Sequence, residues 1–155
     1  MYAFLLTLHS LLRWAVLALL VLVVVRCLQG LRSKGAWSAV TEKVHVALVA
    51  SIDLQLLIGI VLHLFLSPWS KALMANMALG MKDPTLRFFG MEHPVGMLVA
   101  AIVIHVARAR SKRSTSDALR HRRVLLTTLV ALVVTVGSVP WPAGKHARPL
   151  VRMGL

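Results

Sequence analysis

The sequence is poor in cysteine and in acidic side chains. The single cysteine, Cys27, excludes a disulfide framework and any zinc site built on cysteines. Charged residues make up only 15% of the chain, with 5 Asp and Glu in total, whereas soluble domains carry about a quarter. A nucleophile elbow, a phosphate-binding loop and a zinc motif are also missing, so nothing supports a hydrolase or a kinase.

Apolar and basic residues dominate what is present. Hydrophobic residues account for 58% of the 155 residues, and the mean hydropathy is +0.78. This content excludes disorder. A net charge of +13 would ordinarily point to nucleic acid, but in so apolar a chain it points first to a membrane. We therefore exclude nucleic acid as a partner.

Four long apolar runs predict an all-α integral membrane protein, an up-down bundle of four helices in a single domain covering residues 1–155. None of the runs alternates with the period of a strand, and each approaches the ~20 residues that a helix needs to cross a bilayer. The first run lacks the basic start and the cleavage site of a signal peptide. The helices are expected at about 4–26, 44–66, 90–109 and 122–139.

The distribution of Lys and Arg predicts the orientation. Of 18 basic residues, 11 lie in the two segments 26–43 and 108–123, and 6 lie on the opposite side. The positive-inside rule then places these two segments in the cytoplasm and both termini outside, in a multi-pass protein of the bacterial inner membrane.

The longest connection, 67–90, contains methionines at helical spacing. We expect an interfacial helix at about 70–81, lying on the outer membrane surface and ended by Pro84. Asp117 is expected to cap an extension of the fourth helix.

Three histidines from three different helices fall in one layer. Counted inward at ~1.5 Å per residue, His9, His63 and His93 all lie within about two turns of the outer face. Ionisable groups inside a bilayer are costly and usually face the bundle interior, so each is a candidate functional residue. The alternative is that these histidines form hydrogen bonds between helices.

Neutral imidazole is a common axial ligand of haem iron, and bundle cores hold such sites. His9 and His93 fit best as the two iron ligands of a haem b, because helices one and three are diagonal in such a bundle. His63 is a third candidate. Gly96 and Gly59 are expected to let a flat macrocycle approach the backbone.

Two arginines are candidate partners of the haem propionates. Arg13 lies one turn below His9, and Arg87 lies at the outer boundary. The alternative for Arg13 is a buried ion pair with Asp53 of the second helix, which would only fix the helix register.

The remaining histidines support a second haem less well. His45 and His105 belong to the inner half at differing depths, and helix four, expected at 122–139, has no histidine to serve as the diagonal partner of helix two. His121 and His146 lie in charged segments and are expected to be solvated.

A methionine and histidine face offers a copper-handling alternative. Thioethers and imidazole select Cu(I), but methionines also simply fill interfacial helices. Its members are Met74, Met77, Met81, Met91, Met97 and His93. Glu92 is a proton-exchanging group for a quinol, or else an acid that caps helix three.

Several blocks of the chain resemble a family of small bacterial four-helix membrane proteins labelled cytochrome b-like. The resemblance spans nearly the whole chain and rests on the segments 9–14, 81–94 and 138–142. It implies that His9, Arg13, Arg87, Glu92 and His93 match the family's motif positions. The second helix departs, because the family often has a histidine where this chain has Asp53.

Together these features predict a membrane b-type cytochrome, or a cytochrome-like subunit of a redox complex, which exchanges electrons with a quinol in the outer half of the bilayer. The alternative is an accessory or scaffold subunit without a cofactor. Expected partners are membrane lipids, a quinone and a redox partner subunit, with self-association left open.

Overall fold

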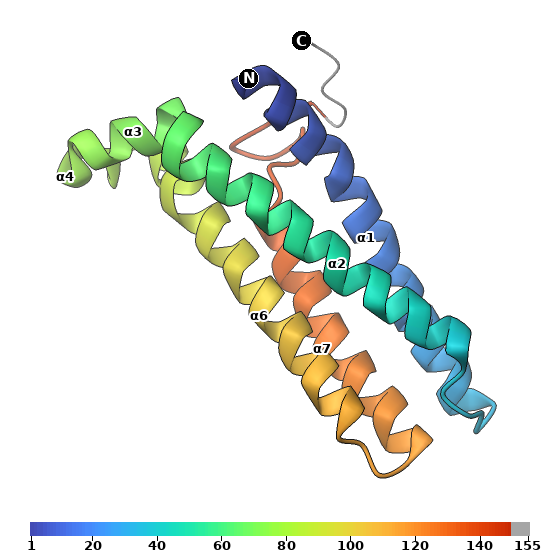
Figure 1. Cartoon of the computed structure of the whole chain (residues 1–155). Helices are drawn as coiled ribbons and strands as arrows, with labels where there is room; N and C mark the ends of the chain where they lie inside the picture. The colour runs from blue at the N-terminus through green and yellow to red at the C-terminus, as the bar shows by residue number, and fades with distance from the viewer. Residues whose placement is uncertain (150–155) are drawn as a thin grey trace.

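The computed structural model describes residues 1–149, and all its regular elements are helices. Four of them are long: α1 (Tyr2–Arg32), α2 (Ala39–Val61), α6 (His93–Lys112) and α7 (Asp117–Ser138). They lie side by side, and consecutive long helices run in opposite directions (Figure 1). α1 packs against α2 and α7, and α6 packs against the same two helices. α1 and α6 therefore lie on opposite sides of the molecule's centre.

Three helical segments are long and apolar enough to cross a membrane, namely Tyr2–Arg32, Ala39–Leu66 and Pro84–Lys112. α7 is not among them, and it starts with the charged segment 117–123. Large apolar side chains cover the outer faces of all four long helices, with Leu57 60% and Val133 71% exposed. Such apolar surface is expected where lipid, rather than water, surrounds the helices. The chain thus has the helices of a membrane protein.

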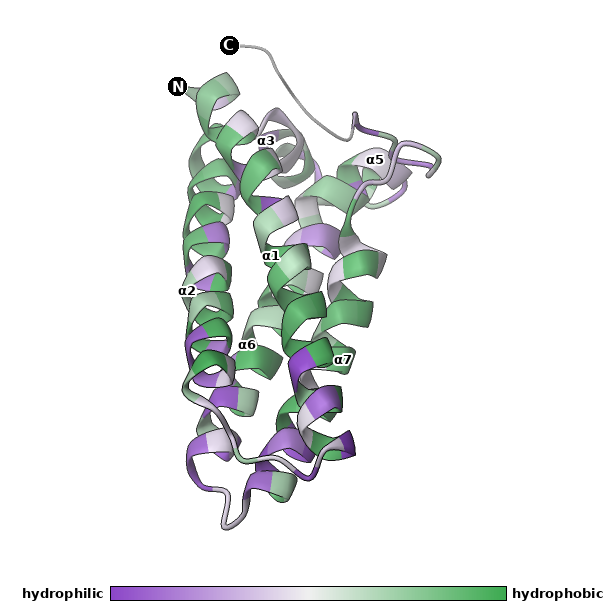
Figure 2. Cartoon of the chain, turned by 90° about the vertical axis from the view of Figure 1, so that its right-hand side faces the viewer, coloured by the Kyte–Doolittle hydropathy of each residue, from purple (hydrophilic) through white to green (hydrophobic). Residues whose placement is uncertain are grey.

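The two ends of the molecule differ in structure, and hydrophilic residues are concentrated on the long helices at one of them (Figure 2). One end holds the short connections 33–38 and 113–116 together with the basic segments 26–43 and 108–123, and we call it the basic end. The other holds the start of α1, the end of α7 and the long connection between α2 and α6 (Figure 1). We call this the cavity end.

Serine caps set the helix starts at the basic end. The Ser38 side chain accepts a hydrogen bond from the Thr41 backbone N–H, and the Ser116 side chain accepts one from that of Leu119. α7 begins five residues earlier than the predicted 122, and α1 runs six residues beyond the predicted 26. Ser116, and not Asp117, is the capping residue, while Asp117 lies in the first turn.

The connection at the cavity end consists of short helices. It contains α3 (Pro68–Ala75), α4 (Met77–Gly80) and α5 (Pro84–Arg87). The single helix predicted over 70–81 is therefore broken, because Asn76 leaves the helical conformation and its side chain caps α4. Two π-helical turns, η1 (Leu62–Leu66) and η2 (Phe88–Glu92), join this connection to α2 and α6. Such turns often mark functional sites.

Candidate functional site at the cavity end

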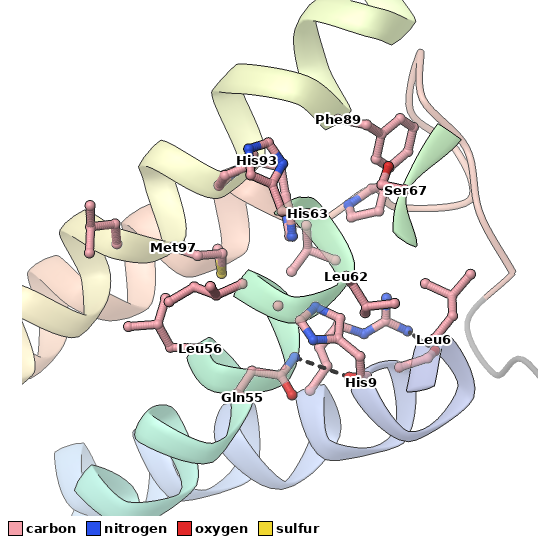
Figure 3. Close-up of a pocket in the computed structure, with 18 of the residues that line it drawn as sticks. Leu6, His9, Gln55, Leu56, Leu62, His63, Ser67, Phe89, His93 and Met97 are labelled. Atoms are coloured by element: carbon pink, nitrogen blue, oxygen red, sulfur yellow. Dashed lines mark hydrogen bonds between the residues drawn. The ribbon is translucent and has the colours of Figure 1, made fainter. Parts of the chain in front are cut away.

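A cavity of about 480 Å³ lies between the long helices at the cavity end. Its wall is largely apolar and includes Leu6 of α1, Leu56 of α2 and Met97 of α6 (Figure 3). A volume of this size and an apolar lining with a few polar groups are typical of small-molecule and cofactor sites.

His9 of α1 and His93 of α6 face each other across this cavity (Figure 3). Their ring centroids are 6.2 Å apart, and the ring planes are inclined by 76°. Because α1 and α6 each pack against α2 and α7, the two imidazoles meet at the centre of the four long helices.

The imidazole of His93 is oriented by the backbone of α7. Its Nδ1 atom lies 2.7 Å from the carbonyl oxygen of Ser138, which can only accept, so Nδ1 carries the proton and donates. Nε2 therefore keeps its lone pair. A backbone carbonyl on the far nitrogen is the usual partner of a metal-binding histidine.

His9 is held from the second helix. Gln55 donates through Nε2 to the backbone carbonyl oxygen of His9 at 3.0 Å. Gly59 leaves room for the ring, because a Cβ there would lie 3.3 Å from the Cε1 atom of His9. The Nδ1 atom of His9 is buried and has no hydrogen-bond partner within residues 1–149. A buried nitrogen in this state is available to a ligand.

His63 lines the same cavity from η1, so the three histidines predicted to share a layer do share one site. Its Nδ1 atom is 2.7 Å from the Oγ atom of Ser70 on α3. Gly96, expected to face a macrocycle, instead packs on α7, where a Cβ would overlap the Ser138 side chain.

The cations of the cavity are only partly those predicted. Arg13 lines the wall, and its guanidinium donates to the Ser10 hydroxyl at 3.4 Å. Arg148 also lines it, with its guanidinium 4.7 Å from the centre of the Phe89 ring. Arg87 does not line the cavity. It forms an exposed ion pair with Glu92 at 2.6 Å.

The buried Arg13–Asp53 ion pair is not formed. Asp53 instead accepts a hydrogen bond from the Nε2 atom of His105 at 2.7 Å, with about half of each side chain exposed. Asp53 lies on the outward face of α2, one residue past the buried Ile52.

The methionines considered as a copper-binding face do not all line the cavity. Met97 lines the cavity, whereas Met74 and Met77 are 55% and 48% exposed. Glu92 occupies the position before α6, but its side chain forms no capping hydrogen bond and binds Arg87 instead.

The donors present at the cavity fit a haem. Haem iron takes imidazole nitrogens as protein ligands, and His9 and His93, with ring centroids 6.2 Å apart, would supply two of them. Arg13 and Arg148 lie in the wall of the same cavity, where their positive charges would balance the carboxylates of a haem. Apolar side chains form most of the remaining wall.

Two further histidines are buried at the basic end, and the burial of one of them was not predicted from the sequence. His121, predicted to be solvated, is 1% exposed, and His45 is fully buried. The signal for the burial of His121 was its helical spacing from the other buried positions of α7, which are Val124, Leu125, Thr128, Ala131 and Thr135.

His146 was also predicted to be solvated. Its ring instead stacks on that of Phe88, with ring centroids 4.3 Å apart.

Comparison with known proteins adds no assignment, because no family model, no curated protein and no solved structure matches the chain.

Proposed function

We propose that the chain is a membrane b-type cytochrome, a four-helix bundle in which α1, α2, α6 and α7 all span the bilayer. Haem is held in the cavity between His9 and His93. The observation that carries the proposal is the pair of imidazoles facing each other at 6.2 Å across an apolar cavity.

Bound haem would supply one-electron exchange at its iron. His93 donates through Nδ1 to Ser138, which leaves Nε2 for the metal. Arg13 and Arg148 balance the propionates, and the apolar wall keeps water from the ring. His63, tied to Ser70, lies beside the pair as a polar group of the wall and not as an iron ligand.

The electron donor or acceptor that suits this site is a quinol or a redox partner subunit in the outer half of the bilayer. The basic end carries most of the Lys and Arg and so lies in the cytoplasm. Both termini and the cavity then lie on the outer side of a bacterial inner membrane.

The test is an absorbance spectrum of the full chain, purified in detergent after expression with added haem precursor. We expect a Soret band and, on reduction, the sharp bands of a haem with two imidazole ligands. Protein that is folded but has no Soret band overturns the proposal and favours an accessory subunit in which the histidines only join helices.

A further inference from the structure

A groove of about 310 Å³ lies between α6 and α7, two helices that pack side by side (Figure 1). Its lining residues are Ile102, Val103, Val106 and Arg110 of α6 and Leu126, Thr127 and Val130 of α7. None of them lines the cavity that contains His9 and His93. The groove is therefore a separate site, which the proposed function does not use.

The wall of this groove suits a hydrocarbon chain. Its exposed apolar side chains are those of Ile102, Val106, Leu126 and Val130. The hydroxyl of Thr127 adds little polarity, because it donates to two backbone carbonyl oxygens of the preceding turn of α7, at 2.7 and 3.2 Å. Its hydrogen is thus satisfied within the helix, and the groove makes no demand for water along its length.

The charged side chain of the groove lies at one end of it. Arg110 is the lining residue nearest the basic end, two residues before α6 ends at Lys112. From Arg110 the lining of α6 continues to Ile102 with apolar residues alone, over roughly 12 Å of helix. A phospholipid has the same order of groups, with a phosphate at the boundary of the hydrocarbon and an acyl chain directed inward.

A second guanidinium group reaches this end of the groove. Arg123 lies one turn of α7 before Thr127, and its side chain donates to the Oγ atom of Ser114 at 3.4 Å. The same hydroxyl donates to the backbone carbonyl oxygen of Arg110 at 2.9 Å. Ser114 therefore links the two arginines and draws the Arg123 side chain to the last turn of α6.

These two cations have no carboxylate partner. The segment 108–123 contains seven Lys and Arg residues and a single acid, Asp117. Glu42 pairs with two other arginines of the segment, whereas neither Arg110 nor Arg123 forms an ion pair in the part of the chain that the structure describes. Neighbouring guanidinium groups without an acid favour a phosphate, to which arginine donates paired hydrogen bonds.

We propose that this groove binds one anionic phospholipid, whose phosphate contacts Arg110 and Arg123 and whose acyl chain lies along α6 and α7. Basic pockets between membrane-spanning helices on the cytoplasmic side bind the headgroups of such lipids, and this is the side proposed for the basic end. The inference goes beyond the proposed function. It needs the outer faces of α6 and α7 to lie in a membrane, but it needs no haem.

The experiment counts the phospholipids retained by the detergent-purified full chain in native mass spectrometry. Phosphatidylglycerol is titrated against phosphatidylcholine with the same acyl chains. We expect one phosphatidylglycerol per chain, and Arg110→Gln should weaken its binding about tenfold, as for the loss of a hydrogen bond to a charged group. The matched control Lys112→Gln removes the same charge from α6 at a position turned by about 200° from Arg110, and it should leave the binding nearly unchanged.

A second pair of variants tests the acyl chain without changing any charge. Val106→Trp fills the middle of the groove and should weaken phosphatidylglycerol binding by a factor similar to that of Arg110→Gln. Val133→Trp adds the same ring at an exposed position of α7 outside the groove, and it should have no effect.

Three results would overturn the proposal. The first is equal retention of the two lipids by the parent protein. The second is equal phosphatidylglycerol binding by Arg110→Gln and Lys112→Gln, because the preference then comes from the overall charge of the basic end. The third is displacement of the lipid by an equal concentration of glycerol phosphate, which would show a phosphate site that does not use the groove.

Should Arg110→Gln fail to fold, Val106→Trp decides, and unchanged phosphatidylglycerol binding by that variant overturns the groove. None of these measurements depends on haem content. A protein without haem that still prefers phosphatidylglycerol at Arg110 would overturn the proposed function and keep the lipid site, and the reverse result would do the opposite.

Discussion

The Nδ1 atom of His93 lies 2.7 Å from the carbonyl oxygen of Ser138, a contact that joins the start of α6 to the end of α7. The same two helices meet at Gly96, where a Cβ would overlap the Ser138 side chain. The orientation of the histidine therefore depends on a close helix approach that only glycine permits.

Gly96→Ala should separate these helices. We expect a loss of about 1–3 kcal/mol in the free energy of unfolding, the usual cost of overpacking, together with weaker haem retention. Thermal unfolding in detergent measures the first effect and the Soret absorbance the second. Gly137→Ala is the matched control, since nothing lies within 4 Å of a Cβ there. It should be neutral or stabilising, and equal behaviour of the two variants would contradict the packing described.

Gly30→Ala tests whether the imidazole of His121 packs against α1 at Gly30. The added methyl group overlaps the imidazole, so the ring must leave the interior or α1 must shift. We expect destabilisation of about 1–3 kcal/mol, again against Gly137→Ala, measured by chemical unfolding. A neutral effect would show that His121 does not lie against α1.

Asp53 should be coupled energetically to His105 and not to Arg13. Hydrogen bonds between membrane helices contribute on average about 0.6 kcal/mol, and the Asp53–His105 contact joins α2 to α6. Double-mutant cycles with Asp53→Asn, His105→Gln and Arg13→Gln, followed by unfolding, should give a coupling of that size for the first pair and none for the second. Coupling between Asp53 and Arg13 alone would reverse the assignment.

Glu42 holds the basic end together. Its carboxylate accepts from Arg108, Arg120 and the indole nitrogen of Trp37, at 2.6, 2.8 and 2.8 Å. Glu42→Gln removes the charge between two guanidinium groups, and we expect a loss of about 2 kcal/mol, as for hydrogen bonds to charged groups. The control is Glu92→Gln, whose exposed pair with Arg87 should contribute less than about 1 kcal/mol. If the two variants lose the same stability in thermal unfolding, Glu42 has no special role.

The level of a residue along the bundle could be predicted from the sequence, whereas the direction in which its side chain points was harder to predict. A constant rise per residue brought His9, His63 and His93 to one level, and all three line one cavity. The same counting put Asp53 near Arg13, but one residue of helix turns a side chain by about 100°. Asp53 therefore faces outward while Ile52 faces the core.

Charged neighbours in the sequence hid the burial of His121. His121 lies between Arg120 and Arg122, which favours a solvated segment, so it was not predicted to be buried even though an extension of the helix from Asp117 was expected. The Ser116 cap extends α7 by more than a turn, and the histidine then falls on the buried face. Arg148 was missed as a cavity residue because its position depends on how the chain returns after α7, which no local pattern encodes.

The central claim, that His9 and His93 hold haem across the cavity, is tested most directly by the haem content of His93→Gln beside that of His105→Gln. Both variants remove one imidazole from α6, but only His93 faces the cavity. The proposed site predicts that His93→Gln loses one haem per chain, with the matching fall in Soret absorbance, and that His105→Gln keeps the parent value. Equal haem content in the two variants, or a folded parent protein without haem, would contradict it.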